Sequence, residues 1–110
     1  MLFRSLPREI EEKLDQVRAL CVKYGVKKLT LFGSAARGEY DPATSDVDFL
    51  IELPENMPTL DRGRALWRMM RELDELFGIY VDLLDLERVE NPYLRRSIEN
   101  NPRIAIYEAA

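Results

Sequence analysis

The chain has 110 residues, of which 46% are hydrophobic and 33% are charged, a composition typical of a folded globular domain rather than a disordered segment. It contains 16 Lys and Arg against 20 Asp and Glu, and the formal net charge of −4 argues against broad, sequence-independent nucleic-acid binding. Histidine is absent from the sequence, which excludes histidine-dependent nucleophilic catalysis and histidine-rich zinc sites.

The sequence also predicts the compartment and the domain count. No apolar run exceeds four residues, so we expect no membrane-spanning segment. The segment 1–8 carries charges and a proline where a signal peptide needs an apolar stretch. A single cysteine, Cys21, cannot form an internal disulfide, and these features together predict a cytoplasmic protein. We expect residues 1–110 to form a single domain.

The first half of the chain is predicted to contain one helix and two strands. Apolar residues recur every three or four positions from Pro7 onward and predict one amphipathic helix that ends near Gly25. Residues 26–32 are predicted as a strand. A loop broken by glycines and proline follows, with room for at most a short helix, and residues 47–53 are predicted as the second strand.

The second half repeats the alternation of helices and strands. Apolar residues between 60 and 77 predict a long helix that stops at Gly78, and residues 79–84 are predicted as a third strand. A helix is expected after Pro92, followed by a short final strand over residues 104–107. This order of elements predicts a layered α/β or α+β domain.

The segment from Gly33 to Gly38 carries the first chemical signal. It reads Gly-Ser-Ala-Ala-Arg-Gly and directly follows a predicted strand. Gly33 would let backbone N–H groups approach an anion closely, and Ser34 adds a hydroxyl donor. Arg37, about one helical turn later, could donate to the same phosphate. A Gly-Ser turn without further support is more often only a turn.

Aspartates supply that support. Asp46 and Asp48 lie at the start of the second predicted strand, where residues i and i+2 point to the same face about 6.6 Å apart. Like charges so placed are costly unless water or cations surround them, and a solvated strand end is the alternative explanation. Asp82 adds a third carboxylate inside an apolar strand, where aspartate is disfavoured. If these strands are neighbours, the three carboxylates suit two Mg²⁺ ions and the phosphates of a nucleotide.

These residues resemble a known signature. The series Gly33-Ser34-x-x-Arg37-Gly38, Ser45-Asp46-Val47-Asp48 and Val81-Asp82 is similar to the motif of the DNA polymerase β-type nucleotidyltransferase superfamily. More narrowly, the chain resembles the minimal nucleotidyltransferases, the MNT proteins usually encoded beside a HEPN-domain toxin. The resemblance covers nearly the whole chain.

The resemblance implies a mixed β-sheet flanked by helices, with the α/β (α+β) nucleotidyltransferase fold. It implies Mg²⁺-dependent transfer of a nucleoside monophosphate from an NTP to a hydroxyl. Gly33 and Ser34 would hold the β- and γ-phosphates, with Arg37 as a further nucleotide contact. The three aspartates would be the catalytic and metal-binding residues, and Asp82 would also favour deprotonation of the acceptor hydroxyl, as a base or through the metal.

The family suggests an antitoxin that adds AMP from ATP to a tyrosine of a HEPN ribonuclease toxin. A chain of 110 residues leaves no domain to select an acceptor, which favours a protein acceptor or an oligomer. Two alternatives are an antitoxin that neutralises by binding alone and a nucleotidyltransferase that acts on a small molecule such as an aminoglycoside. The complete aspartate set argues against the first, and the lack of a substrate domain argues against the second.

Other conspicuous residues have simpler explanations. Asp85 is expected to be a turn residue. Trp67, Met69 and Met70 are expected to serve helix packing, with a partner surface as the alternative. Arginines at helical spacing are expected to form a solvated face, although an acidic partner or nucleotide phosphates could also bind them. These arginines are Arg62, Arg64, Arg68 and Arg71.

Overall fold

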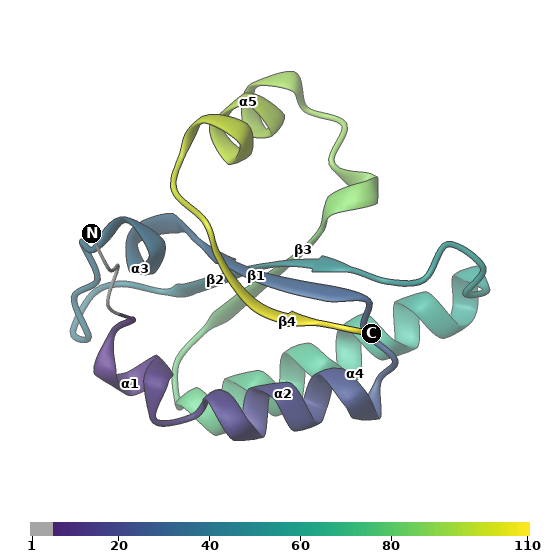
Figure 1. Cartoon of the computed structure of the whole chain (residues 1–110), viewed down its shortest axis with the longest axis horizontal. Helices are drawn as coiled ribbons and strands as arrows, with labels where there is room; N and C mark the ends of the chain where they lie inside the picture. Colours follow the sequence, from purple (N-terminus) through teal and green to yellow (C-terminus); the bar gives the residue numbers. More distant parts are fainter. Residues whose placement is uncertain (1–5) are drawn as a thin grey trace.

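The computed structural model describes residues 6–110, which form a four-stranded mixed sheet with helices on both faces (Figure 1). Its elements are α1 (Arg8–Glu11), α2 (Leu14–Lys23), β1 (Lys28–Phe32), α3 (Gly33–Arg37), β2 (Val47–Glu52), α4 (Thr59–Phe77), β3 (Val81–Asp85), the 3₁₀ turn η1 (Leu86–Arg88), α5 (Pro92–Asn100) and β4 (Ile104–Glu108). The expectation for segment 1–8 rests mainly on its first five residues, which lie outside the described range.

The strand order is β3-β2-β1-β4. β1 is antiparallel to both β2 and β4, whereas β2 and β3 are parallel and joined by α4. The predicted mixed sheet flanked by helices is therefore confirmed. From residue 6 onward, no helix is both long and apolar enough to span a bilayer.

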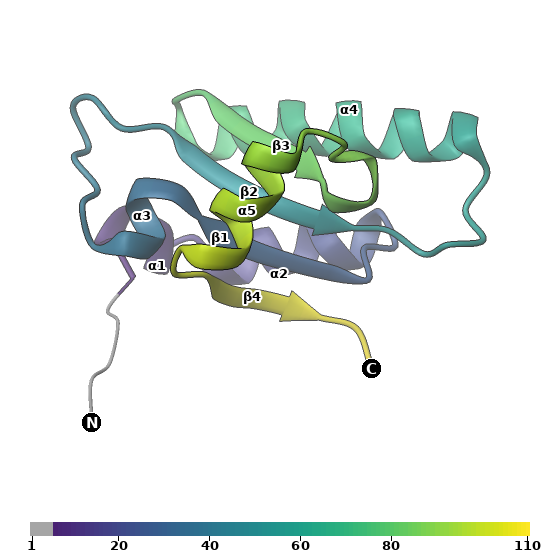
Figure 2. The same ribbon diagram turned by 90° about the horizontal axis from the view of Figure 1, so that it is seen from above.

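Alternation of side chains along the strands separates a large core from a small one. Leu31 and Phe49 belong to the large core, together with residues of α2 and α4 on the lower face of the sheet in Figure 1. Phe32, Leu50 and Leu84 belong to the small core on the other face, together with residues of α5. Figure 2 looks onto this second face and shows α5 crossing the sheet.

A buried ion pair joins α4 to the end of β3. The Arg62 Nη1 donates to Asp85 Oδ2 at 3.1 Å, and its Nη2 donates to the carbonyl oxygen of Pro54 at 3.0 Å. Arg62 and Asp85 are only 5% and 8% exposed. The prediction that Arg62 lies on a solvated face is wrong, and Asp85 is more than a turn residue. The reason is that strand alternation points Asp85 toward α4, where only a cation can compensate its burial.

The predicted helix from Pro7 to Gly25 is in fact two helices. Lys13, with φ −110° and ψ 7°, separates α1 from α2. Its N–H donates to the carbonyl of Ile10, three residues earlier, whereas in a continuous α-helix it would donate to the carbonyl four residues earlier. Ile10 and Val17, on opposite sides of this break, are both fully buried. Both residues belong to the large core, so the break does not separate the two helices from it.

Candidate functional site

Gly33 begins α3 directly after β1 and lies against Asp48. Its φ of +72° is in the left-handed region that favours glycine. A Cβ at this position would lie 3.2 Å from Asp48 Cγ, and closer still to Asp48 Oδ2. The sheet register explains this contact, because Phe32 pairs with Asp48 across β1 and β2. The structure therefore brings the Gly-Ser turn and the first strand aspartate into one place, with Ser34 in the first turn of α3.

Asp48 and Asp82 occupy paired positions in the parallel strands β2 and β3. Both lie on the sheet face covered by α5, because Leu50 and Leu84, two residues further along each strand, belong to the core that includes α5. Asp48 is half-buried, and Asp46, just before β2, is exposed. The crossover through α4 thus places side by side two carboxylates that are 34 positions apart in the sequence.

The electrostatics of the site converge on Asp48. Its pKa is raised from 3.8 to about 6, mainly by burial and then by the negative charges of Asp82 and Asp46. Arg37, at the end of α3, lowers the same pKa but does not cancel the rise. The Arg37 Nε also donates to Glu39 Oε2 at 3.2 Å, so part of its charge is directed away from the carboxylates. A carboxylate with a raised pKa among like charges is characteristic of functional sites.

The donor set of this site fits a hard divalent cation. Carboxylate oxygens are the ligands that Mg²⁺ prefers, and a bound cation would compensate both the burial of Asp48 and its repulsion by Asp82 and Asp46, which together raise its pKa. Within residues 6–110, however, no group of three acidic or cysteine side chains is spaced to enclose a metal ion unaided. Mg²⁺ usually retains waters and binds phosphates in addition to one or two carboxylates. The residues therefore fit a metal that binds together with a nucleotide.

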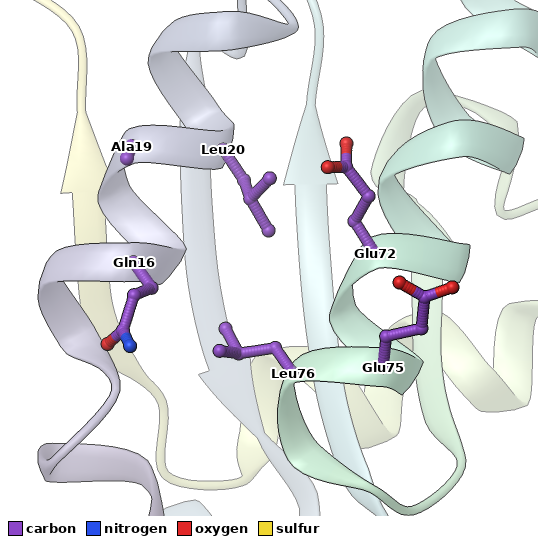
Figure 3. A pocket seen from close by; sticks show the side chains of 6 residues that line it. All are labelled: Gln16, Ala19, Leu20, Glu72, Glu75 and Leu76. Carbon is purple, nitrogen blue, oxygen red and sulfur yellow. The ribbon is translucent and has the colours of Figure 1, made fainter.

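A separate hollow of about 380 Å³ lies between α2 and α4 (Figure 3). Its lining residues are Gln16, Ala19, Leu20, Glu72, Glu75 and Leu76. Figure 3 shows the side chains of Leu20 and Leu76 pointing into the gap between the two helices. Glu72 already accepts hydrogen bonds from Lys23 and from the Tyr24 hydroxyl. This hollow lies on the opposite sheet face from Asp48 and Asp82, so it is distinct from the candidate site.

Helix α5 contributes a feature that the sequence analysis did not single out. Tyr93 is 76% exposed on this helix, and the Arg96 guanidinium carbon lies 5.8 Å from the centre of its ring. The only signal in the sequence is that Tyr93 falls outside the apolar pattern made by Leu94 and Ile98. Its helix packs on the sheet face that carries Asp48 and Asp82.

Comparisons with known proteins agree with this geometry. The nucleotidyltransferase domain model matches residues 11–105. Two Methanocaldococcus jannaschii proteins, both provisionally named protein adenylyltransferases, are 38% identical over 95 residues and 39% identical over 94 residues. Each alignment covers 84% of this chain and 91% of the relative.

Solved structures share the fold. A protein provisionally described as a minimal nucleotidyltransferase is 30% identical, with a TM-score of 0.59 over 84% of this chain and 89% of the other. A toxin–antitoxin structure with AMP-PNP has a TM-score of 0.63 at 17% identity, over 87% of this chain and 73% of the other. A Shewanella oneidensis complex of an MNT antitoxin with a tri-AMPylated HEPN toxin has a TM-score of 0.61 at 15% identity, over 90% of this chain and 72% of the other. The chain therefore belongs to the nucleotidyltransferase family, as its motif predicted, and is a nucleotidyltransferase enzyme.

Proposed function

We propose that this protein is a Mg²⁺-dependent adenylyltransferase that transfers AMP from ATP to a tyrosine hydroxyl of a HEPN ribonuclease toxin and thereby acts as its antitoxin. The observation that carries the proposal is the half-buried Asp48, paired in register with Asp82 and packed against Gly33. The names of the archaeal relatives and the AMPylated toxin in the Shewanella oneidensis complex support the donor and the acceptor.

Each site residue has a role in this proposal. The backbone at Gly33 and the hydroxyl of Ser34 would bind the β- and γ-phosphates, and Arg37 would add a guanidinium donor from the end of α3. The carboxylates of Asp46, Asp48 and Asp82 would hold Mg²⁺, with two ions expected. Bound Mg²⁺ would neutralise charge on the phosphates and on the departing pyrophosphate.

The transfer itself exchanges one P–O bond for another. The acceptor oxygen attacks the α-phosphorus of ATP, and the bond from that phosphorus to the oxygen bridging to the β-phosphate breaks. Pyrophosphate leaves with the electron pair, and the hydroxyl proton passes to the Asp82 carboxylate. Most of the rate acceleration would come from positioning and charge stabilisation, as in other phosphoryl and nucleotidyl transfers. AMP remains on the acceptor as a phosphodiester.

The test uses the full chain, ATP labelled at the α-phosphate, Mg²⁺ and the product of the neighbouring gene, which the proposal expects to be a HEPN protein. We expect label on a tyrosine of the HEPN protein and loss of its ribonuclease activity. Asp48→Asn should abolish both effects, whereas Glu55→Gln, a charge-matched change in the exposed loop after β2, should preserve them.

Two results would contradict the proposal in different ways. If Asp48→Asn silences the ribonuclease as well as the wild-type protein does, without label transfer, neutralisation occurs by binding alone. If label reaches an aminoglycoside and not the HEPN protein, the enzyme acts on a small molecule.

A further inference from the structure

Helix α5 lies on the sheet face that carries the aspartates, immediately beyond them along the strands. Its Leu94 and Ile98 share a core with Phe32, Leu50 and Leu84. Phe32 directly precedes the Gly-Ser turn, and the two leucines each lie two residues after an aspartate of the site. Asp48 therefore lies between Gly33, which begins α3, and the core that α5 shares with the two strands. Figures 1 and 2 show where α3 and α5 lie relative to the sheet.

Hydrogen bonds fix the rotation of α5 about its axis. The Arg95 Nε donates to the carbonyl of Val89 at 2.7 Å and its Nη2 donates to the carbonyl of Leu86 at 3.4 Å, so Arg95 lies on the side of η1. A helix turns by about 100° per residue, so residues 93 and 97 lie about 200° from Arg95. Both views show η1 and α3 on opposite sides of α5, η1 being the green turn between β3 and α5. Tyr93 is therefore on the flank of α5 opposite η1, the side on which α3 lies.

The start of α5 also holds the Tyr93 backbone firmly. Asn91 caps the helix, with its Oδ1 accepting from the N–H of Tyr93 at 2.9 Å and from that of Leu94 at 3.4 Å. Pro92 occupies the first helical position, where its restricted φ favours the helix. An aromatic ring on such a fixed backbone loses little conformational entropy when a ligand packs on it.

The Tyr93 ring presents the chemistry of a base-stacking platform. The Arg96 guanidinium lies on the ring at 5.8 Å, and the side chain of Tyr93 remains 76% exposed, so ring surface is left for a ligand. Aromatic rings bind nucleobases by stacking, which is strongest for the larger purines, and arginine adds a cation–π contribution.

We propose that Tyr93 is the stacking platform for the purine base of the nucleoside triphosphate whose phosphates bind at Gly33 and Ser34. The inference rests on the proposed function, because it needs a nucleotide at the aspartates. The base would lie between the α3-facing flank of α5 and the site, with the ribose spanning the distance to Asp48. Tyr93 thus selects and orients the nucleotide and takes no part in bond breaking.

A second exposed aromatic residue with an arginine beside it lies on the other face of the sheet and provides a matched control. Trp67 of α4 is 57% exposed, and the Arg71 guanidinium carbon lies 5.0 Å from the centre of its ring. The prediction that Trp67 packs on its helix is thus wrong for much of its surface. This pair has the same chemistry as Tyr93 and Arg96, but α4 covers the sheet face away from Asp48. Removing Trp67 should leave nucleotide binding unchanged.

Calorimetry with the full chain and Mg²⁺ tests the inference. The probes are α,β-methylene ATP, which cannot transfer AMP, its cytidine counterpart, and inorganic tripolyphosphate. We expect Tyr93→Ala to weaken binding of the adenine analogue about tenfold and to remove its advantage over the cytidine analogue. Tripolyphosphate affinity should not change, Tyr93→Trp should retain adenine binding, and Trp67→Ala should behave as wild type.

Each contrary result is distinct. If Tyr93→Ala binds the adenine analogue as tightly as wild type does, Tyr93 is not a stacking platform. The same follows if the variant binds the analogue and tripolyphosphate equally more weakly. Neither result contradicts the proposed function. If the wild-type protein binds none of the three probes, the inference and the proposed function both fail.

Discussion

Asp48→Asn should make the protein more stable, although it removes a residue of the proposed catalytic site. A rise in pKa from 3.8 to about 6 corresponds to about 3 kcal/mol of unfavourable free energy when the carboxylate is ionised in the folded state. Asp48 is only half-buried, so solvent screening reduces this to about 1.5 kcal/mol. Asparagine has nearly the same shape as aspartate and no charge. The melting temperature of Asp48→Asn should therefore be about 6 °C above that of the wild-type protein at about pH 8 without Mg²⁺.

The pH dependence of this stability difference shows whether it arises from ionisation of Asp48. Because the folded-state pKa of Asp48 is raised, its favourable contribution is complete below the unfolded value of 3.8 and is lost as the pH rises through about 6. The advantage of Asp48→Asn should therefore be nearly absent at about pH 3.5, should grow between about pH 4 and 6, and should then stay constant.

Thermal and urea unfolding across this range provide the measurement, with Glu55→Gln as a control that should stay within about 0.5 kcal/mol of wild type. An advantage that is constant with pH, or a loss of stability at about pH 8, would refute the reasoning.

Three further outcomes are expected from the same structure. Mg²⁺ at millimolar concentration together with α,β-methylene ATP should raise the melting temperature of the wild-type protein more than that of Asp48→Asn, because the cation pairs with the carboxylates and the phosphates; equal shifts in differential scanning calorimetry would contradict this. In urea unfolding, Gly38→Ala should cost about 1 kcal/mol for its positive φ alone, whereas Gly33→Ala should cost about 2–3 kcal/mol because its Cβ would also meet Asp48; equal costs would remove the packing argument. Asp85→Ala should destabilise the protein by about 2 kcal/mol, because the buried Arg62 would keep only the Glu87 carboxylate at 3.3 Å and the Pro54 carbonyl as partners; the double variant Arg62→Met/Asp85→Leu should lose less than half as much, and an equal or larger loss would contradict this.

Much of the candidate site could be predicted because its elements are local in sequence. Gly33 and Ser34 follow directly after a strand, and Asp46 and Asp48 are separated by the period of a strand, so simple geometry groups them. The pairing of Asp48 with Asp82 is different in kind. It depends on the parallel register of β2 and β3 across a 19-residue helix, which no local pattern specifies.

The residues that were misjudged are those whose environment depends on tertiary packing. Four arginines share the spacing of an exposed helix face, and Arg62 is buried only because β3 ends with Asp85 beneath α4. Tyr93 is similar, since the flank of α5 on which it lies follows from the hydrogen bonds that hold Arg95 to the carbonyls of Leu86 and Val89. Periodicity predicts which elements form, whereas contacts between elements decide which side chains they bury.

The central claim is that the carboxylates beside the Gly-Ser turn catalyse nucleotidyl transfer. The most direct measurement is the single-turnover rate of label transfer from α-phosphate-labelled ATP to the HEPN protein, compared among wild type, Asp48→Asn and Glu55→Gln. We expect transfer by wild type and Glu55→Gln at similar rates, and a rate at least about 1,000-fold lower for Asp48→Asn, although that variant should be more stable than wild type. Transfer by Asp48→Asn within about tenfold of wild type would contradict it.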